Sequence, residues 1–170
     1  MQELERFLIS MEGRAFRMAQ LATQNEADAL DIVQDAMFKL VKLYADKTPT
    51  DWKPLFLSIL ESRIMDWHRK QNLRKKLFFW RKETDEYEQT EQTRISPVDL
   101  SNPEDELLSS QLEKRLLNSI AALPVQQQQC FILRAWEGLS IAETALAMNL
   151  NENSVKTHYA RALSKLKEQL

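Results

Sequence analysis

The sequence predicts an all-α fold, in which two small helical domains are joined by a flexible acidic linker. Apolar residues recur at spacings of three and four in both halves of the 170-residue chain, and residues 1–80 show no alternating pattern of the kind that strands require. Two glycines and five prolines are few, as is typical of a helix-rich chain. We expect domains at residues 1–82 and 106–170, with the linker at residues 83–105.

The first helix is predicted from one broad apolar face near the N-terminus. Apolar side chains repeat there at three and four residues, which places them along one side of a helix. Gly13 lies within this run and weakens the helix slightly. The predicted inward residues are Leu4, Phe7, Leu8, Met11, Ala15, Met18, Ala19 and Ala22.

A second helix is predicted to follow Asn25, whose side chain can cap its first turn. Its inward stripe is predicted to be Ala29, Val33, Ala36, Met37, Leu40, Val41 and Tyr44. The other side carries Asp28, Asp31, Gln34, Asp35 and Phe38. This outer face is acidic with one exposed aromatic ring, and without the neighbouring motifs a solvated charged face would explain it as well.

A third helix is predicted from the run DWKPLFLSILESRIMDWHRKQNLRKK, after a loop at residues 45–50. Pro54 is tolerated because it falls in the first turn. Trp52 and Phe56 are more typical of core residues when taken singly, since large aromatic side chains at helical spacing usually pack inward. The helix becomes strongly basic, with Arg63, Arg69, Lys70, Arg74, Lys75, Lys76, Arg81 and Lys82.

The apolar cluster at residues 77–80 (Leu, Phe, Phe, Trp) is flanked by Lys76 and Arg81. Three roles fit it: completing the domain core, contacting single-stranded DNA, or packing against the second domain. We favour packing over DNA contact, because an exposed cluster of this size promotes unwanted association.

The linker is predicted from charge and composition. The net charge of −2 conceals a basic segment followed by an acidic one, and the sign changes near residue 83. Residues 83–102 are polar, lack a helical apolar stripe and contain Ser96-Pro97, with Asn102-Pro103 just beyond. These features predict an acidic tether between the two domains.

Two short helices separated by residues 149–151 are predicted near the C-terminus. Ser140 and Glu143 form a capping box at the start of the first helix, whose apolar side is Ile141, Ala145, Leu146 and Met148. Asn151 caps the second helix, and Val155, Tyr159, Ala162 and Leu166 follow at inward spacing. Its outer face suits the major groove of DNA and carries Asn153, Ser154, Lys156, Thr157, His158, Arg161 and Lys165. An ordinary amphipathic surface helix is the simpler alternative.

The sequence shows no arrangement suited to enzymatic chemistry. Cys130 is the single cysteine and lies in an apolar segment, so we interpret it as a small core residue that forms no intramolecular disulfide. His68 and His158 lack companions at metal-ligand spacing, and two glycines do not make a phosphate-binding loop. No apolar run is long enough to span a bilayer, and no secretory signal is evident. We expect a cytoplasmic monomer that is not an enzyme and uses no metal or cofactor.

The segment LPVQQQQCFILRAWEGLSIAETALAMNLNENSVKTHYARALSKLKEQL resembles region 4 of the sigma-70 family of bacterial RNA polymerase sigma factors. The matching positions are Leu123-Pro124, Phe131, Leu133, Arg134, Glu137-Gly138-Leu139-Ser140 and Val155-Lys156. His158 and Leu163 replace arginines that are common in the family. The resemblance implies that the outer face of the last helix reads the minus-35 promoter element.

The N-terminal half resembles sigma region 2. NEADALDIVQDAMFKLVKLY is similar to region 2.2, which docks on the clamp coiled coil of the largest polymerase subunit, and this implies core-binding roles for Asp31, Gln34, Asp35 and Phe38. The third helix is similar to regions 2.3 and 2.4, which hold the melted minus-10 element. The residues implied there are Trp52, Ser62, Arg63, Asp66, Arg69 and Lys70. Ser62 replaces an asparagine common in the family, and it and the 45–50 loop are predicted to set sequence preference.

Nearly the whole chain therefore resembles an extracytoplasmic-function (group IV) sigma factor, which has only regions 2 and 4. The resemblance implies binding to core polymerase (the clamp helices of the largest subunit and the flap of the second), promoter DNA and an anti-sigma factor, without membrane insertion. The acidic linker resembles the sigma linker along the RNA-exit path, although an ordinary solvated tether fits equally. Two alternatives are a stand-alone helix-turn-helix regulator, which binds duplex DNA without polymerase, and a sigma-mimicking interaction protein.

Overall fold

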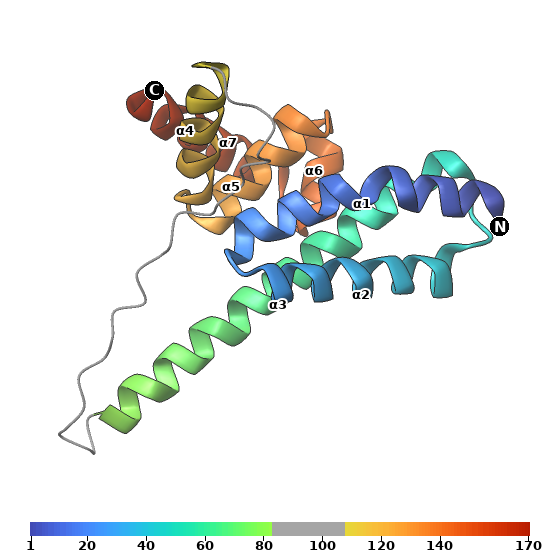
Figure 1. Ribbon diagram of the computed structural model, residues 1–170, viewed down its shortest axis with the longest axis horizontal. Coiled ribbons are helices and arrows are strands. Elements are labelled where there is room, and N and C mark those ends of the chain that lie inside the picture. Colours follow the sequence, from blue (N-terminus) through green and yellow to red (C-terminus); the bar gives the residue numbers. More distant parts are fainter. Residues whose placement is uncertain (83–107) are drawn as a thin grey trace.

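The computed structural model describes residues 1–82 and 108–170, and all regular secondary structure within these ranges is helical, as predicted (Figure 1). The predicted linker at residues 83–105 lies outside the described residues. The helices are α1 (Gln2–Thr23), α2 (Glu26–Tyr44), α3 (Pro49–Lys82), α4 (Leu108–Ala121), α5 (Val125–Phe131), the π-helical turn η1 (Ile132–Trp136), α6 (Ile141–Met148) and α7 (Glu152–Gln169).

The N-terminal helices α1, α2 and α3 pack against one another through their apolar faces (Figure 1). The Asn25 side chain accepts a hydrogen bond from the Asp28 amide at 3.0 Å, which fixes the start of α2 as predicted. Met11, Met18 and Leu40 are fully enclosed. Val41 was expected to point inward but is 37% exposed, because it lies about 100° around α2 from Leu40.

Helix α3 is 34 residues long, and only its first half lies within the bundle. Phe56, Leu57, Leu60 and Ile64 are completely buried there. Beyond residue 72 the helix extends past α1 and α2 (Figure 1), and Leu77, Phe79 and Trp80 are 56%, 71% and 76% exposed. The prediction that this cluster packs inward is therefore wrong, because the helix carries it beyond the other described helices.

The C-terminal helices pack around α7, which contacts α4, α5 and α6. Val155, Ala162 and Leu166 are buried as predicted, and Tyr159 is half-buried. Leu146 was predicted to be inward but is 81% exposed, since α6 buries the side with Ala145 and Met148. Around that helix, Leu146 lies about 100° from Ala145 and about 200° from Met148.

The two sets of helices also pack against each other, α3 on α6 and α1 on α4 and α5. The contact includes several polar side chains. Gln128 is 2% exposed, and its amide nitrogen donates to the Leu21 carbonyl of α1 at 3.0 Å and to the Ile120 carbonyl at 3.1 Å. Gln24 reaches back from the end of α1 to the Ala121 carbonyl at 3.2 Å. Polar hydrogen bonds therefore add to a contact that also includes apolar side chains, since one hydrophobic core extends through both halves.

Candidate functional site

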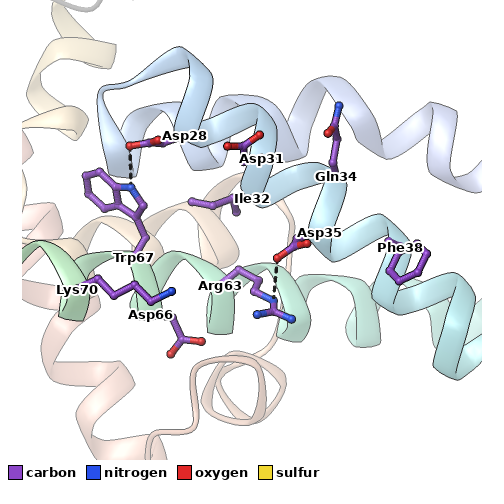
Figure 2. A pocket seen from close by; sticks show the side chains of 10 residues that line it. All are labelled: Asp28, Asp31, Ile32, Gln34, Asp35, Phe38, Arg63, Asp66, Trp67 and Lys70. Atoms are coloured by element: carbon purple, nitrogen blue, oxygen red, sulfur yellow. Dashed lines mark hydrogen bonds and ion pairs between the residues drawn. The ribbon is translucent and has the colours of Figure 1, made fainter.

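A groove runs between α2 and α3, and both helices contribute charged side chains to it (Figure 2). The α2 side consists of Asp28, Asp31, Ile32, Gln34, Asp35 and Phe38. The α3 side consists of Arg63, Asp66, Trp67 and Lys70. All four residues predicted to bind core polymerase therefore line one groove, together with three predicted to hold the minus-10 element.

The predicted core-binding residues are available at the surface. Asp31, Gln34 and Asp35 are exposed, and the Phe38 ring is 67% exposed. Ile32, between them, is buried and fixes the helix to the bundle. An exposed aromatic ring beside several carboxylates is the arrangement expected of a docking face, because the ring supplies buried area and the charges select a basic partner.

Polar contacts link the two walls of the groove (Figure 2). Arg63 Nε of α3 lies 3.8 Å from Asp35 Oδ2 of α2, and Trp67 Nε1 donates to Asp28 Oδ2 at 2.9 Å. The residues that sequence reasoning divided between polymerase and DNA are thus neighbours. Trp67 and Asp28 were missed as partners, because only the packing of α2 on α3 brings positions 39 residues apart together.

All the minus-10 candidates but one reach the surface of α3. Ser62, Arg69 and Lys70 are exposed, Asp66 is half-buried, and Arg69 pairs with Asp66 at 2.7 Å. Trp52 is only 5% exposed. Its ring packs 5.9 Å from Phe7, and its Nε1 donates to the Tyr44 carbonyl at 3.1 Å. We therefore remove Trp52 from the minus-10 set, because its ring belongs to the core.

The turn before α7 is held by a dense set of local hydrogen bonds. The Ser140–Glu143 capping box is present, with bonds of 3.0 and 3.1 Å, and the Asn151 side chain accepts from the Ser154 amide at 2.7 Å. Arg134 donates to the Leu139 carbonyl and lies 5.5 Å from the centre of the Tyr159 ring. These bonds confirm both predicted caps and fix where α6 and α7 begin.

The outer face of α7 presents the predicted polar set to solvent. Asn153, Lys156, Thr157, Arg161 and Lys165 are exposed, while Ser154 and His158 are half-buried. The Thr157 hydroxyl donates a hydrogen bond to the Asn153 carbonyl at 3.0 Å. Its oxygen therefore remains available to a binding partner chiefly as a hydrogen-bond acceptor. Partial burial, and then the nearby Arg161 charge, lower the pKa of His158 below its usual range. A neutral imidazole is therefore favoured on this face at neutral pH.

A buried carboxylate joins the two halves of the molecule, and sequence reasoning missed it. The Glu137 side chain is 3% exposed and lies 3.3 Å from both Arg14 Nη1 of α1 and Lys53 Nζ of α3. Lys53 Nζ also donates to the Glu137 carbonyl at 3.0 Å. These partners are 123 and 84 positions away, so no local sequence signal indicates the pairing.

A second buried carboxyl, Glu61 of α3, lies near Cys130 of α5. Glu61 is 0% exposed, neither of its oxygens has a hydrogen-bond partner within the described ranges, and burial raises its pKa to about 8. Burial and the nearby Glu61 raise the pKa of the Cys130 thiol to about 12. Cys130 is fully enclosed with its Sγ 3.3 Å from Met148 Sδ, which confirms it as an unreactive core residue.

Other kinds of site are not seen in residues 1–82 and 108–170. Acidic, histidine and cysteine side chains do not gather there in groups able to ligate a metal. Among the described helices, none combines the length and apolar character that a bilayer crossing requires.

The C-terminal helices match a known family. A family profile described as "Sigma-70, region 4" matches residues 113–166, which run from α4 to α7 and include the capped turn. The chain is 31% identical over 157 residues to RNA polymerase sigma factor SigV of Bacillus subtilis (strain 168), a match that covers 91% of this chain and 83% of the relative. This chain belongs to the sigma-70 family of RNA polymerase sigma factors.

Further comparisons place this sigma factor in the extracytoplasmic-function group. The ECF RNA polymerase sigma factor BldN of Streptomyces coelicolor is 45% identical over 65 residues, although that match covers 38% of this chain and 25% of BldN. The sigma factor RpoE, solved with the anti-sigma factor NepR from Bartonella quintana, has the same fold with a TM-score of 0.69. That alignment covers 99% of this chain and 97% of the RpoE chain at 17% identity. The sigma factor therefore shares the RpoE fold over nearly its full length.

Proposed function

We propose that this sigma factor docks on core RNA polymerase through the α2–α3 groove, holds the melted minus-10 promoter element along α3 and reads the minus-35 element with α7. In this proposal residues 1–82 act as region 2, residues 106–170 as region 4 and residues 83–105 as the connecting linker. The chain itself is not an enzyme, because the polymerase supplies the chemistry of transcription.

The observation that carries the proposal is the composition of the groove. Its exposed Phe38 ring, surrounded by Asp31, Gln34 and Asp35, fits a basic helix pair on the polymerase clamp. The opposite wall supplies Arg63 and Lys70, cations suited to a DNA backbone that passes close to the same partner. A docking face and a strand-holding face on adjacent helices would couple polymerase binding to DNA opening.

The face of α7 supports duplex reading by the second half. Small polar residues near the start of the helix can approach base edges, whereas Lys156, Arg161 and Lys165 further along can hold phosphates. The caps at Ser140 and Asn151 fix the first turns of α6 and α7, and the two helices pack against each other, which supports docking of α7 into a major groove.

We also propose that an anti-sigma factor restrains this chain. The support is that RpoE was solved with the anti-sigma factor NepR and CnrH with the cytosolic domain of CnrY, and both share this fold, with TM-scores of 0.69 and 0.60. Such an anti-sigma factor would compete with core polymerase for binding to this chain.

Core binding is the decisive test. Purified core polymerase should bind the full chain and initiate at a cognate promoter. Phe38→Ala should weaken core binding at least tenfold, because truncating a central aromatic anchor commonly costs more than about 1.4 kcal/mol. Leu43→Ala is the matched control, since Leu43 is 49% exposed and lies about 140° around α2 from Phe38.

Reversing the charges on α2 provides a second test of core binding. Asp31→Lys combined with Asp35→Lys should abolish core association but leave binding of α7 to duplex DNA unchanged. Glu5→Lys combined with Glu12→Lys, on the exposed surface of α1, makes the same charge change outside the groove and should alter neither core association nor duplex binding. Wild-type chain that fails to bind core, or reversed charges that impair core and duplex binding equally, would overturn the proposal.

A further inference from the structure

The exposed end of α3, residues 73–80, is an aromatic and basic surface that the proposed contacts leave unused. Trp80 is 76% exposed and Phe79 is 71% exposed, and Leu73 and Leu77 are also more than half exposed. Figure 1 shows this part of α3 extending beyond the other described helices. Large apolar side chains displayed in this way are uncommon on a protein surface unless they meet a partner.

The charge of this segment points to a polyanionic partner. Residues 67–82 contain seven lysines and arginines and no acidic residue. Arg74, Lys75 and Lys76 occupy the helical turn before the aromatic side chains and are exposed. Cations alternating with flat rings form the usual surface for single-stranded nucleic acid, because the cations hold phosphates and the rings stack on bases.

Helical spacing places this surface beside the candidate minus-10 residues. Arg69, Leu73, Lys76 and Trp80 follow one another at spacings of four, three and four residues, so they form a single stripe along α3. The distance along the helix from Arg69 to Trp80 is about 16 Å at 1.5 Å per residue. The stripe therefore prolongs the proposed DNA-holding face by the length of several nucleotides.

We propose that the end of α3 is an additional binding surface for single-stranded DNA, on which the Trp80 and Phe79 rings stack on bases while Lys75 and Lys76 hold the backbone. The inference rests on the proposed function for the identity of the strand, which is the one adjoining the minus-10 contacts. An acidic protein partner fits the cations but does not need flat rings. An anionic membrane surface fits both features but has no link to the stripe shared with Arg69.

The test measures binding of the full chain to a fluorescein-labelled oligo(dT) of about 20 nucleotides, a length that exceeds common site sizes, and to a mixed-sequence duplex of equal length. Trp80→Leu should weaken oligo(dT) binding roughly 5- to 150-fold, the range for losing one stacked base. Trp80→Phe should restore most of the affinity because it retains a flat ring. Both variants should fold normally, since the side chain they replace is mostly exposed.

The cations supply a separate readout. Replacing Lys75 and Lys76 by Gln should reduce the salt dependence of oligo(dT) binding by about 0.7 units of slope for each phosphate that the variant no longer neutralises. Lys114→Gln on α4 is the control, because Lys114 is exposed on the other half of the molecule. Duplex binding should change much less than oligo(dT) binding in every α3-end variant.

Three outcomes would overturn the inference. They are equal oligo(dT) affinities for Trp80→Leu and wild type, an effect confined to the duplex, and Trp80-dependent binding to phosphatidylserine vesicles without binding to the oligonucleotide. Core binding is measured in parallel. If the wild-type chain binds oligo(dT) in a Trp80-dependent way but does not bind core polymerase, only the proposed function is wrong. If the chain binds core polymerase and the Trp80 variants bind DNA as wild type does, only this inference is wrong.

Discussion

Lys53 of α3 donates to the backbone carbonyl of Glu137 at 3.0 Å and lies 3.3 Å from the carboxylate of the same residue, so one ammonium group makes two contacts between the halves of this sigma factor. Arg14 of α1 binds the same carboxylate at 3.3 Å. Removing either cationic partner of a buried carboxylate destabilises the protein, because the buried negative charge is then less well compensated. Charged contacts therefore contribute to the packed arrangement, beside the amide hydrogen bonds and the shared apolar core.

This packed arrangement conflicts with simultaneous use of both DNA surfaces. The names of the minus-35 and minus-10 elements place them about 25 base pairs apart, or about 85 Å at 3.4 Å per base pair. The longest helix of the packed body, α3, is only about 51 Å long. If the proposed contacts with both elements form at the same time, the two halves would have to separate.

Weakening the Lys53–Glu137 contact should favour the separated form. Lys53→Gln removes a partly exposed ammonium group, so the loss is about 1 kcal/mol, or roughly a fivefold shift from packed to separated chains. Small-angle X-ray scattering should show a larger radius of gyration for this variant than for Lys47→Gln, an exposed lysine in the turn before α3. Identical scattering from the two variants at low and high salt would contradict this role for Lys53.

Glu61 should make stability depend on pH in an unusual direction. Its pKa of about 8 in the folded chain exceeds the ordinary value of 4.5, so the folded state binds more protons than the unfolded state between these pH values. Stability contributed by the neutral carboxyl is complete below about pH 4.5 and falls as pH rises to about 8. At about 1.36 kcal/mol per pKa unit, the loss is roughly 3 to 5 kcal/mol.

Urea unfolding of wild type and Glu61→Gln at several pH values between the two pKa values isolates this contribution. The amide does not titrate, so the variant should lack the decline and exceed wild type in stability at about pH 8. The histidines, including His68 with its lowered pKa, are common to both chains and cancel in the difference. Glu113→Gln, on the surface of α4, should follow the wild-type curve. Parallel curves for wild type and Glu61→Gln would show that Glu61 ionises freely in the folded chain.

Local signals accounted for most of the fold. The apolar stripes predicted α1, α2 and α7 because a helix repeats about every 3.6 residues, and the caps at Asn25, Ser140 and Asn151 act within three residues of sequence. The errors arose where tertiary context decides. Leu146 has the right spacing for α6 but lies on the side that no neighbour covers in the described structure, and Trp80 lies past the end of the bundle.

The candidate site was predictable only in part for the same reason. The outer faces of α2 and α7 follow from spacing within single helices, so their exposed residues were placed correctly at the surface. Which residues face one another across helices does not follow from spacing. The Arg63–Asp35 pair, the burial of Trp52 and the Glu137 contacts all depend on how separate helices pack.

The capping box should contribute measurably to stability. Ser140→Ala removes the acceptor for the Glu143 amide and should lower the free energy of unfolding by about 1 kcal/mol, as for other N-caps. Thermal or urea unfolding measures the change, with Ser164→Ala on the exposed side of α7 as the control. A decrease shared equally by the two variants would point to a general serine effect instead of the cap.

The exposed cations of α7 should divide into phosphate and base contacts by their response to salt. If Lys156 and Arg161 hold phosphates, Lys156→Gln and Arg161→Gln should each weaken binding to mixed-sequence and cognate duplexes alike and reduce the salt slope by about 0.9. Lys167→Gln, exposed near the end of α7, should leave the slope unchanged. Weaker binding to the cognate duplex alone, with the slope intact, would instead assign that residue to direct base reading, since base contacts release few counterions.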